Sequence, residues 1–295
     1  MIATTGFFDG VHLGHRLVIE RLVSLARERG DESLVVTFWP HPRAVLQDGA
    51  RELRLLNSLE EKKELLRSLG VDRVEVLDFT RSFAALTAEQ YLREILRDRF
   101  GVTTLLMGYD NRLGSDRLTA DTLKPIAEGI GMELKELLPL SFRPSEASGE
   151  ISSTQIRTAL ENGDIVSAAE MLGYGYSLKG VVVAGNRLGR TIGFPTANMK
   201  LYEPLKLVPG RGVYAVEAEV LGKKYRGMTN IGLRPTVGGS FTTIETHILD
   251  FDEDIYGLPL RITFLRRLRD EVHFPSLAAL KDQLEKDRDC CREQK

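Results

Sequence analysis

The stretch that decides the interpretation of this chain is Gly6-Phe7-Phe8-Asp9-Gly10-Val11-His12-Leu13-Gly14-His15. The apolar residues from Met1 to Thr5 predict a strand before it, and apolar positions between Arg16 and Arg29 recur at helical spacing after it. A glycine-rich turn at a helix start can hold phosphate, because the helix N-terminus presents unpaired N–H groups and a partial positive charge. His12 and His15 add hydrogen-bond donors that can stabilise negative charge as it develops on phosphate oxygens. The stretch therefore predicts nucleotide chemistry as well as nucleotide binding.

Two plainer explanations of the same residues have to be weighed. His12 and His15 could be zinc ligands, but a zinc site needs further ligands, and only His41 lies nearby, without a Cys or carboxylate at metal-site spacing. Gly10 and Gly14 could be ordinary turn glycines. The concentration of glycine, histidine and aspartate within these ten residues favours a phosphate site over a zinc site or an ordinary turn.

The composition is typical of a globular chain. Its 295 residues are enough for two domains, and 42% of them are hydrophobic and 28% charged. The net charge of −2 gives no general attraction to nucleic acid or to an anionic membrane, and no apolar run has the length of a membrane span. Cys290 and Cys291 are adjacent and almost terminal, which suits neither a disulfide framework nor a metal site. We expect a cytoplasmic protein with no nucleic-acid partner and no membrane partner; the oligomeric state is left open.

The first half of the chain alternates apolar runs with helical patterns. Strands are predicted at residues 34–38, 73–79 and 102–107, extended chain at 134–140, and helices at 58–69, 87–100 and 118–130, the last interrupted near Pro125. This alternation predicts a parallel sheet wound with helices, which binds ligands at the carboxyl ends of its strands. The decamer, residues 38–42 and residues 108–110 all follow predicted strands.

The pattern of apolar residues changes after two short helices, predicted at residues 154–161 and 164–172. Short strands separated by Gly, Pro, Asn and Asp turns are then predicted at residues 178–184, 212–221, 224–230, 242–250 and 260–264. This pattern favours an antiparallel barrel or sandwich, followed by a final helix over residues 276–288. We therefore expect two domains, residues 1–172 and 173–295.

A second polar motif lies far along the chain, at Ile151-Ser152-Ser153-Thr154-Gln155-Ile156-Arg157. Hydroxyls at a helix start, with Arg157 one turn after Thr154, suit the departing phosphates of a nucleotide. Taken alone, the same residues would be an ordinary Ser/Thr helix cap.

Together, the decamer and this second motif resemble the HxGH and ISSTxIR motifs in the adenylyltransferase half of bacterial bifunctional riboflavin kinase/FAD synthetases. The resemblance implies that FMN and ATP give FAD and pyrophosphate. It assigns His12 and His15 to the α-phosphate and the transition state, and Arg157 to catalysis at the leaving pyrophosphate. ATP and phosphate contacts are implied for Gly6, Phe7, Asp9, Gly14, Asp110, Ser153 and Thr154. Asp9 could instead hold the turn or the metal environment, and His41 could be a flavin- or phosphate-side residue or a structural one.

One segment departs from the family pattern. After Gly108-Tyr109-Asp110 the family usually has two aromatic residues around a basic one, followed by a basic loop. Here both aromatics are missing from residues 111–118, and Asp116 adds a negative charge. We expect stacking on the adenine or the flavin to be weaker, or to come from elsewhere in the chain.

The second half carries its own motif in Gly185-Asn186-Arg187-Leu188-Gly189-Arg190-Thr191-Ile192-Gly193-Phe194-Pro195-Thr196-Ala197-Asn198. Gly189 and Gly193 predict a flexible flap, and Thr196 and Asn198 offer neutral oxygens of the kind that Mg²⁺ accepts. Alone, Pro-Thr-Ala-Asn is a common turn. Here it resembles the PTAN motif of riboflavin kinases with the preceding GRxxGFP loop. The resemblance implies ATP contacts for Gly189, Arg190, Gly193, Thr196 and Asn198, and Mg²⁺ binding by Thr196 and Asn198.

Glu245 completes the implied kinase. In a strand, Glu245 and His247 point to the same face. Glu245 could be a solvated strand carboxylate, whereas the resemblance makes it the general base for the riboflavin hydroxyl. A base is useful there because the nucleophile is a primary alcohol. The implied reaction converts riboflavin and ATP to FMN and ADP.

The sequence therefore predicts a Rossmann-like nucleotidyltransferase domain followed by a mostly antiparallel β-barrel kinase domain with a C-terminal helix. Its expected partners are riboflavin, FMN and ATP, with Mg²⁺ as cofactor. Two alternatives stay open. The first is a nucleotidyltransferase for another small phosphate, with the barrel as a flavin-binding or sensing module. The second is a flavin-binding protein without catalytic activity.

Overall fold

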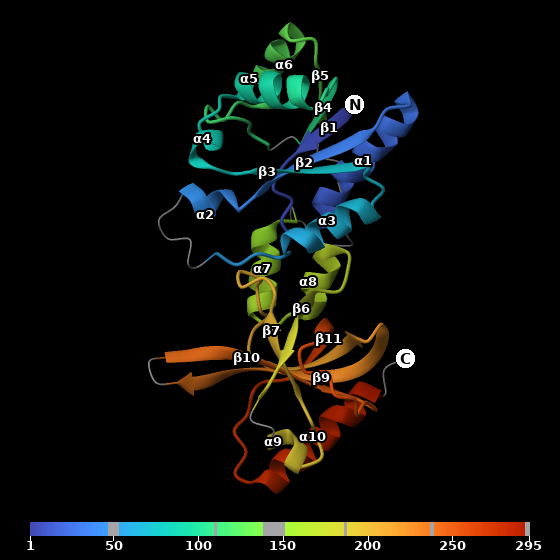
Figure 1. The fold of residues 1–295 in the computed structure, drawn as a ribbon, viewed down its shortest axis with the longest axis vertical. Helices are drawn as coiled ribbons and strands as arrows, with labels where there is room; N and C mark the ends of the chain where they lie inside the picture. The colour runs from blue at the N-terminus through green and yellow to red at the C-terminus, as the bar shows by residue number, and fades with distance from the viewer. Residues whose placement is uncertain (47–52, 109–110, 138–150, 186–187, 237–238, 293–295) are drawn as a thin grey trace. The chain divides into compact units, whose positions relative to one another are not determined.

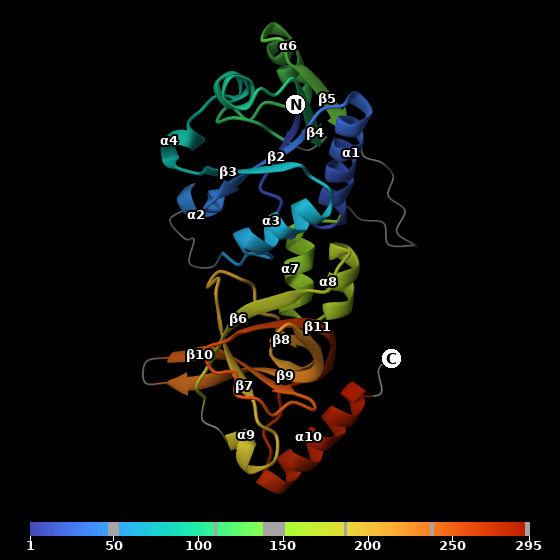
Figure 2. The same cartoon turned by 45° about the vertical axis from the view of Figure 1, so that its right-hand side comes forward.

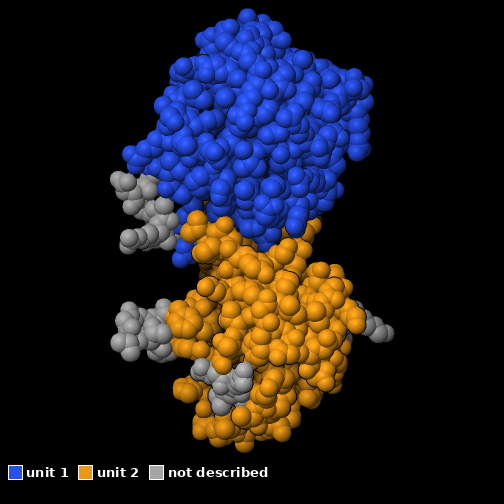
Figure 3. Space-filling view, viewed as in Figure 1, with its two compact units in different colours: residues 1–152 blue, residues 153–295 orange. Residues whose placement is uncertain are grey.

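The structure, a computed structural model, describes residues 1–46, 53–108, 111–137, 151–185, 188–236 and 239–292. The chain divides into two compact units, Met1–Ser152 and Ser153–Lys295, which Figure 3 shows in blue and orange. The division falls ahead of the predicted boundary at residue 172, so the two helices between these positions belong to the second unit. Each unit is described by itself below.

The first unit is built on a parallel sheet with the strand order β3-β2-β1-β4-β5. Its strands are β1 (Ile2–Thr5), β2 (Ser33–Trp39), β3 (Arg73–Asp78), β4 (Thr104–Gly108) and β5 (Glu133–Leu137), and each neighbouring pair is parallel. β1 is the central strand, so the decamer that follows it starts from the middle of the carboxyl edge (Figure 1). The predicted wound parallel sheet is confirmed.

Helices cover both faces of this sheet. Successive strand residues point to opposite sides, and the apolar residues on each side pack against helices. Ile2, Val35 and Leu106 pack with the buried residues of α1 (Leu13–Arg29) and α3 (Leu59–Ser68). Their strand neighbours pack with the π-helix η2 (Tyr91–Arg99) and α6 (Ala120–Gly129). The remaining helices of the described part of this unit are short: α2 (Pro42–Leu46), α4 (Arg81–Ala84) and α5 (Ala88–Gln90).

Local signals located the helix ends of the first unit well. Ser58 and Glu61 form a capping box at the start of α3, as do Thr87 and Gln90 at the start of α5. The expected break at Pro125 is wrong, because α6 runs through it. Pro125 and Asp121 are both exposed, so the helix turn in which the Asp121 carbonyl loses its helical donor lies at the surface.

The second unit begins with α7 (Ser153–Glu161) and α8 (Ile165–Leu172), close to the predicted bounds. A closed barrel follows, with the order β10-β7-β6-β11-β8-β9 and antiparallel neighbours throughout. Its strands are β6 (Ser177–Val183), β7 (Ala197–Leu201), β8 (Gly212–Val220), β9 (Lys223–Thr236), β10 (Gly239–Ile248) and β11 (Pro259–Arg269). The predicted antiparallel barrel is confirmed, but the sequence analysis missed β7, whose short pattern mixes polar and apolar residues.

The C-terminal helix α10 (Leu277–Arg292) packs on the outside of the barrel. Cys291 and Leu284 contact a small apolar cluster that contains Ala215 and Met228. Arg269 of β11 adds a two-pronged ion pair to the buried carboxylate of Asp287, with N–O distances of 2.8 and 2.9 Å. These contacts hold the helix over one side of the barrel, as Figure 2 shows. Among the helices that the structure describes, none is long and apolar enough to cross a membrane.

Candidate active sites

The decamer of the first unit forms a tight turn between β1 and α1. Phe8, Gly10 and Val11 have φ values of 53°, 83° and 36°, a left-handed conformation that is unusual for Phe and Val. Buried Asp9 accepts hydrogen bonds from the backbone N–H groups of Leu56, at 3.0 Å, and Asn57, at 3.3 Å. The Asp9 carboxylate therefore ties the turn to the segment that precedes α3, while its contact with ATP stays a prediction.

The two histidines of the decamer lie together at the start of α1. His12 is the N-cap residue, and its ring stacks on that of His15 with centroids 3.7 Å apart and an interplanar angle of 20°. Burial, the neighbouring His12 and the Lys62 ammonium group together lower the pKa of His15 well below its ordinary value. His15 is therefore neutral at pH 7.

Gly14 lies close beside the stacked rings. A Cβ at this position would lie 3.3 Å from two atoms of the His12 ring and 3.8 Å from the carbonyl oxygen of Ile151. A side chain at position 14 would therefore require a small shift of the His12 ring. The same contact brings Ile151, the first residue of the second motif, beside the decamer. The turn therefore combines a helix start with the paired imidazoles that its predicted chemistry needs.

The remaining residues that the sequence assigned to adenylyl transfer lie in different parts of the chain, and not all of them are described by the structure. Ser153, Thr154 and Arg157 lie in α7, which belongs to the second unit, and their role at the leaving phosphates stays a prediction. Asp110 lies outside the described residues. His41 accepts a hydrogen bond from the Arg43 N–H at its Nδ1, and its ring packs edge-on against Phe7 with centroids 4.1 Å apart.

The unusual loop at residues 111–118 has a structural explanation for its acidic residue. Asp116 accepts a hydrogen bond of 3.0 Å from the backbone N–H of Ala88, the first residue of α5. A carboxylate at a helix N-terminus pairs with unpaired N–H groups and with the positive end of the helix. Aromatic residues lie elsewhere near the same sheet edge, where Phe38 packs with Phe79, Phe83 and Tyr91.

Lys62 of α3 also belongs to this site, although no sequence motif indicated it. Its side chain is fully buried, and its Nζ lies 3.5 Å from the centre of the Phe7 ring. The signal was available, because Lys62 precedes buried Leu66 by four residues and so shares its inward face. Hydrophobic periodicity counts only apolar residues, so it does not indicate a lysine that lies on the buried face of a helix.

In the second unit, the barrel brings the PTAN motif and Glu245 side by side. Asn198 of β7 pairs directly with Glu245 of β10, which pairs on its other side with Asn230 of β9. Directly paired residues place their side chains on the same face of a sheet. The register therefore puts Asn198, Glu245 and Asn230 in one polar row, although the sequence separates them widely.

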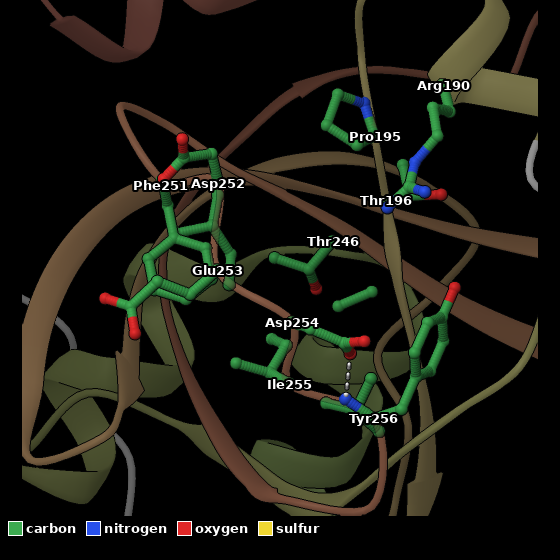
Figure 4. Close-up of a pocket in the computed structure, with 13 residues that line it drawn as sticks. Arg190, Pro195, Thr196, Thr246, Phe251, Asp252, Glu253, Asp254, Ile255 and Tyr256 are labelled. Atoms are coloured by element: carbon green, nitrogen blue, oxygen red, sulfur yellow. Dashed lines mark hydrogen bonds between the residues drawn. The ribbon is translucent and has the colours of Figure 1, made fainter.

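Two cavities lie on either side of this part of the barrel. The larger, about 570 Å³, is lined by Glu245, His247 and Asn230 together with residues of α10. The smaller, about 290 Å³, is lined by Thr246, Arg190 and the segment 251–256. Figure 4 shows Arg190 and Thr196 on one side of the smaller cavity, with Thr246 between them and that segment. Thr196 lines both cavities, so it stands where a group could pass from one to the other.

Contacts around Glu245 add two residues that the sequence analysis left without a role. Arg234 forms an ion pair with the Glu245 carboxylate at 3.2 Å. The Nδ1–H of His247 donates a hydrogen bond of 2.8 Å to the Pro195 carbonyl oxygen. Burial lowers the pKa of His247, although this hydrogen bond opposes the shift. The neutral imidazole thus connects β10 to the PTAN motif.

The two glycines before the PTAN motif differ in their surroundings, because Gly189 makes a close contact and Gly193 has open space beside it. Gly189 lies in the short helix α9 (Leu188–Thr191), and the Phe194 carbonyl oxygen occupies the space that a Cβ would need. Phe194 donates a 2.8 Å backbone hydrogen bond back to Gly189. Gly193 has a φ of 85°. Among the described residues, this segment contains a short helical turn that brings Arg190 to the smaller cavity, and its flexibility stays a prediction.

Comparison with known proteins gives a consistent result for both units. The FAD synthetase family model matches residues 1–155, and the riboflavin kinase family model matches residues 172–295. The chain is 37% identical to the bifunctional riboflavin kinase/FMN adenylyltransferase of Bacillus subtilis, over 97% of this chain and 90% of that protein. It is 38% identical to the protein of the same name from Escherichia coli K12, over 99% of this chain and 92% of that protein.

Among solved structures, one described as a macrolide-efflux protein from Streptococcus pneumoniae superposes with a TM-score of 0.91. It shares 33% sequence identity and covers 100% of this chain and 94% of its own. The two folds in this order, the motifs that they carry and the matches over nearly the whole chain agree. The chain belongs to the family of bifunctional riboflavin kinase/FMN adenylyltransferases.

Proposed function

We propose that this chain makes FAD from riboflavin in two steps, phosphorylating riboflavin at the barrel and adenylylating FMN at the parallel sheet. The observation that carries the proposal is the polar row of Asn198, Glu245 and Asn230, next to two cavities that share Thr196. Phosphoryl transfer needs a donor and an acceptor on either side of one position, which this arrangement offers.

At the barrel, the larger cavity suits riboflavin and the smaller one the phosphates of ATP. The larger is about 570 Å³, within the range of small-molecule sites, and mostly apolar residues of the barrel and α10 surround its polar groups. Glu245 accepts the proton of the riboflavin primary alcohol while that oxygen attacks the γ-phosphorus of ATP and ADP departs. Arg190 approaches the phosphates from the smaller cavity.

The residues present fit a magnesium ion beside these phosphates. Thr196 and Asn198 supply neutral oxygen ligands, and the Asn198 amide packs into a space that only a glycine at position 185 leaves open. A magnesium ion completes its shell with waters and phosphate oxygens, so two protein ligands suffice. Thr196 and Asn198 would hold it, and it would supply positive charge to the phosphates of ATP.

At the parallel sheet, the nucleophile is a phosphate oxygen of FMN, which is already anionic and needs no general base. It attacks the α-phosphorus of ATP, and pyrophosphate leaves. The N–H groups at the start of α1 and the His12–His15 pair stabilise the charge that develops on the α-phosphate. Ser153, Thr154 and Arg157 bind the departing pyrophosphate. Neutral His15 acts in this step as a hydrogen-bond donor.

A flavin time course tests the two-step proposal. The full chain is incubated with riboflavin, ATP and magnesium, and the flavins are separated at intervals. We expect FMN to accumulate first and FAD to follow, because the first product is the substrate of the second step. A sample without magnesium is the matched control and should form far less of either product.

The other outcomes favour the alternatives. FMN without FAD would mean that the parallel-sheet unit acts on another phosphate substrate. No product from riboflavin or from added FMN, with riboflavin still bound, would contradict both activities and favour a flavin-binding protein.

A further inference from the structure

The decamer turn rests on a buried positive charge that neither family motif includes. Lys62 has no exposed surface, whereas its neighbour Lys63 is partly exposed and forms an ion pair with Glu60 of the same helix. Lysine is almost never fully buried unless its charge has partners. The contacts of Lys62 therefore indicate what its burial serves.

The contacts of the Lys62 ammonium group lead to the turn. Its Nζ lies 3.5 Å from the centre of the Phe7 ring, a cation–π contact. It also donates a 3.4 Å hydrogen bond to Thr37 Oγ1, which in turn donates a 3.2 Å hydrogen bond to the Phe7 carbonyl oxygen. The carboxylate of Asp9 attracts it as well. One cation thus engages the Phe7 ring directly, the Phe7 carbonyl through Thr37, and the acidic residue of the same turn through its charge.

We propose that Lys62 is a positioning residue of the adenylyl-transfer site, whose buried ammonium group fixes the Gly6–Gly10 turn and thereby sets the place of His15. The proposal rests on the proposed FMN adenylyltransferase function. Lys62 acts through the turn and through its electric field, so its loss should change the histidine pair even in the absence of substrate.

The electrostatics separate this role from simple packing. Burial lowers the pKa of Lys62 from 10.5 to about 8, against the attraction of Asp9. Holding the charged form at neutral pH therefore costs folding free energy, because the unfolded chain binds that proton more tightly. Replacing the ammonium group by an apolar group of similar length should leave the fold as stable or more stable. If Lys62 served only packing, its replacement would lower the stability of the fold. A residue that is retained for function can instead reduce stability while it supports activity.

The groups that bias His15 are His12 on its own helix, Lys62 on α3 and, through Lys62, Asp9 in the turn. His12 and Lys62 both lower the pKa of His15, so removing the Lys62 charge should raise it. The shift is measurable because the chain has only 5 histidines.

The test compares Lys62→Met, Lys62→Arg and the control Lys63→Met in the full chain. Imidazole NMR signals are followed against pH, with the His15 signal assigned from a His15→Asn spectrum. FAD formation from supplied FMN, FMN formation from riboflavin and thermal unfolding are measured on the same samples. For Lys62→Met we expect a raised His15 pKa, an unfolding temperature no lower than that of the unmodified chain, and FAD formation slowed roughly 10- to 100-fold, as for a displaced catalytic group.

Lys62→Arg should keep the low His15 pKa and recover part of the FAD formation, and Lys63→Met should match the unmodified chain in every readout. An unchanged His15 pKa in folded Lys62→Met would overturn the proposal, as would undiminished FAD formation. If Lys62→Met does not fold, the role is packing and the proposal fails unless Lys62→Gln folds and shows the expected shift. A chain that makes no FAD at all would contradict the proposed function, while the His15 titration would still decide the role of Lys62.

Discussion

Glu245→Gln should stop the formation of FMN from riboflavin while leaving the formation of FAD from supplied FMN intact. The amide keeps the size of the side chain but cannot accept the proton of the attacking alcohol. Loss of a positioned general base slows a reaction about 10²- to 10⁴-fold. The second step has an anionic nucleophile and does not use Glu245, so it should not change. The measurement is separate initial rates with riboflavin and with FMN.

Glu217→Gln is the matched control for this variant. Glu217 also lies on a barrel strand and forms an ion pair, with Lys224 at 2.8 Å, but it lines neither of the two cavities described above. It should keep both rates. Binding of riboflavin should persist in Glu245→Gln, because the cavity is otherwise unchanged. A Glu245→Gln variant that still phosphorylated riboflavin at the normal rate would show that Glu245 is not the base.

His15→Ala should give the reverse result, with FMN formed normally and FAD formation lost. The imidazole is a donor to the developing charge on the α-phosphate, and removing one such donor costs about 3–4 kcal/mol of transition-state stabilisation, roughly 10²- to 10³-fold in rate. His15→Asn retains one donor and should recover part of the activity. If His15→Ala removed both activities from a folded chain, the two sites would not be independent.

The pH dependence gives this variant a second readout. Because the folded pKa of His15 lies below the ordinary 6.5, the unfolded chain takes up the proton first as the pH falls. The unmodified chain should therefore lose folding stability as the pH falls through 6.5 and below, whereas His15→Ala should lack this contribution. Thermal unfolding at pH 7.5 and at pH 5.5 measures the difference. An equal loss in both proteins would mean that His15 is not held neutral.

Much of the fold could be predicted because its signals are local. The capping boxes at Ser58 and Thr87 and the apolar spacing of α1 act within a few residues of one another. β7 gave no comparable signal, since a short strand is stabilised by its neighbours more than by its own residues. From the sequence, Asp116 is only an added negative charge in the loop. Its hydrogen-bond partner, Ala88, is far from it in sequence, so no local pattern indicates the contact.

The sequence by itself determined the two folds and their order, and with them the motifs at Gly6–His15 and Pro195–Asn198, because hydrophobic periodicity, caps and turn residues are encoded over short distances. Only the tertiary structure decided that Glu245 pairs with Asn198 and that Lys62 is buried behind Phe7. Strand register and the burial of a charge depend on which distant segments come together. The energy of such contacts belongs to pairs of residues that no local pattern connects.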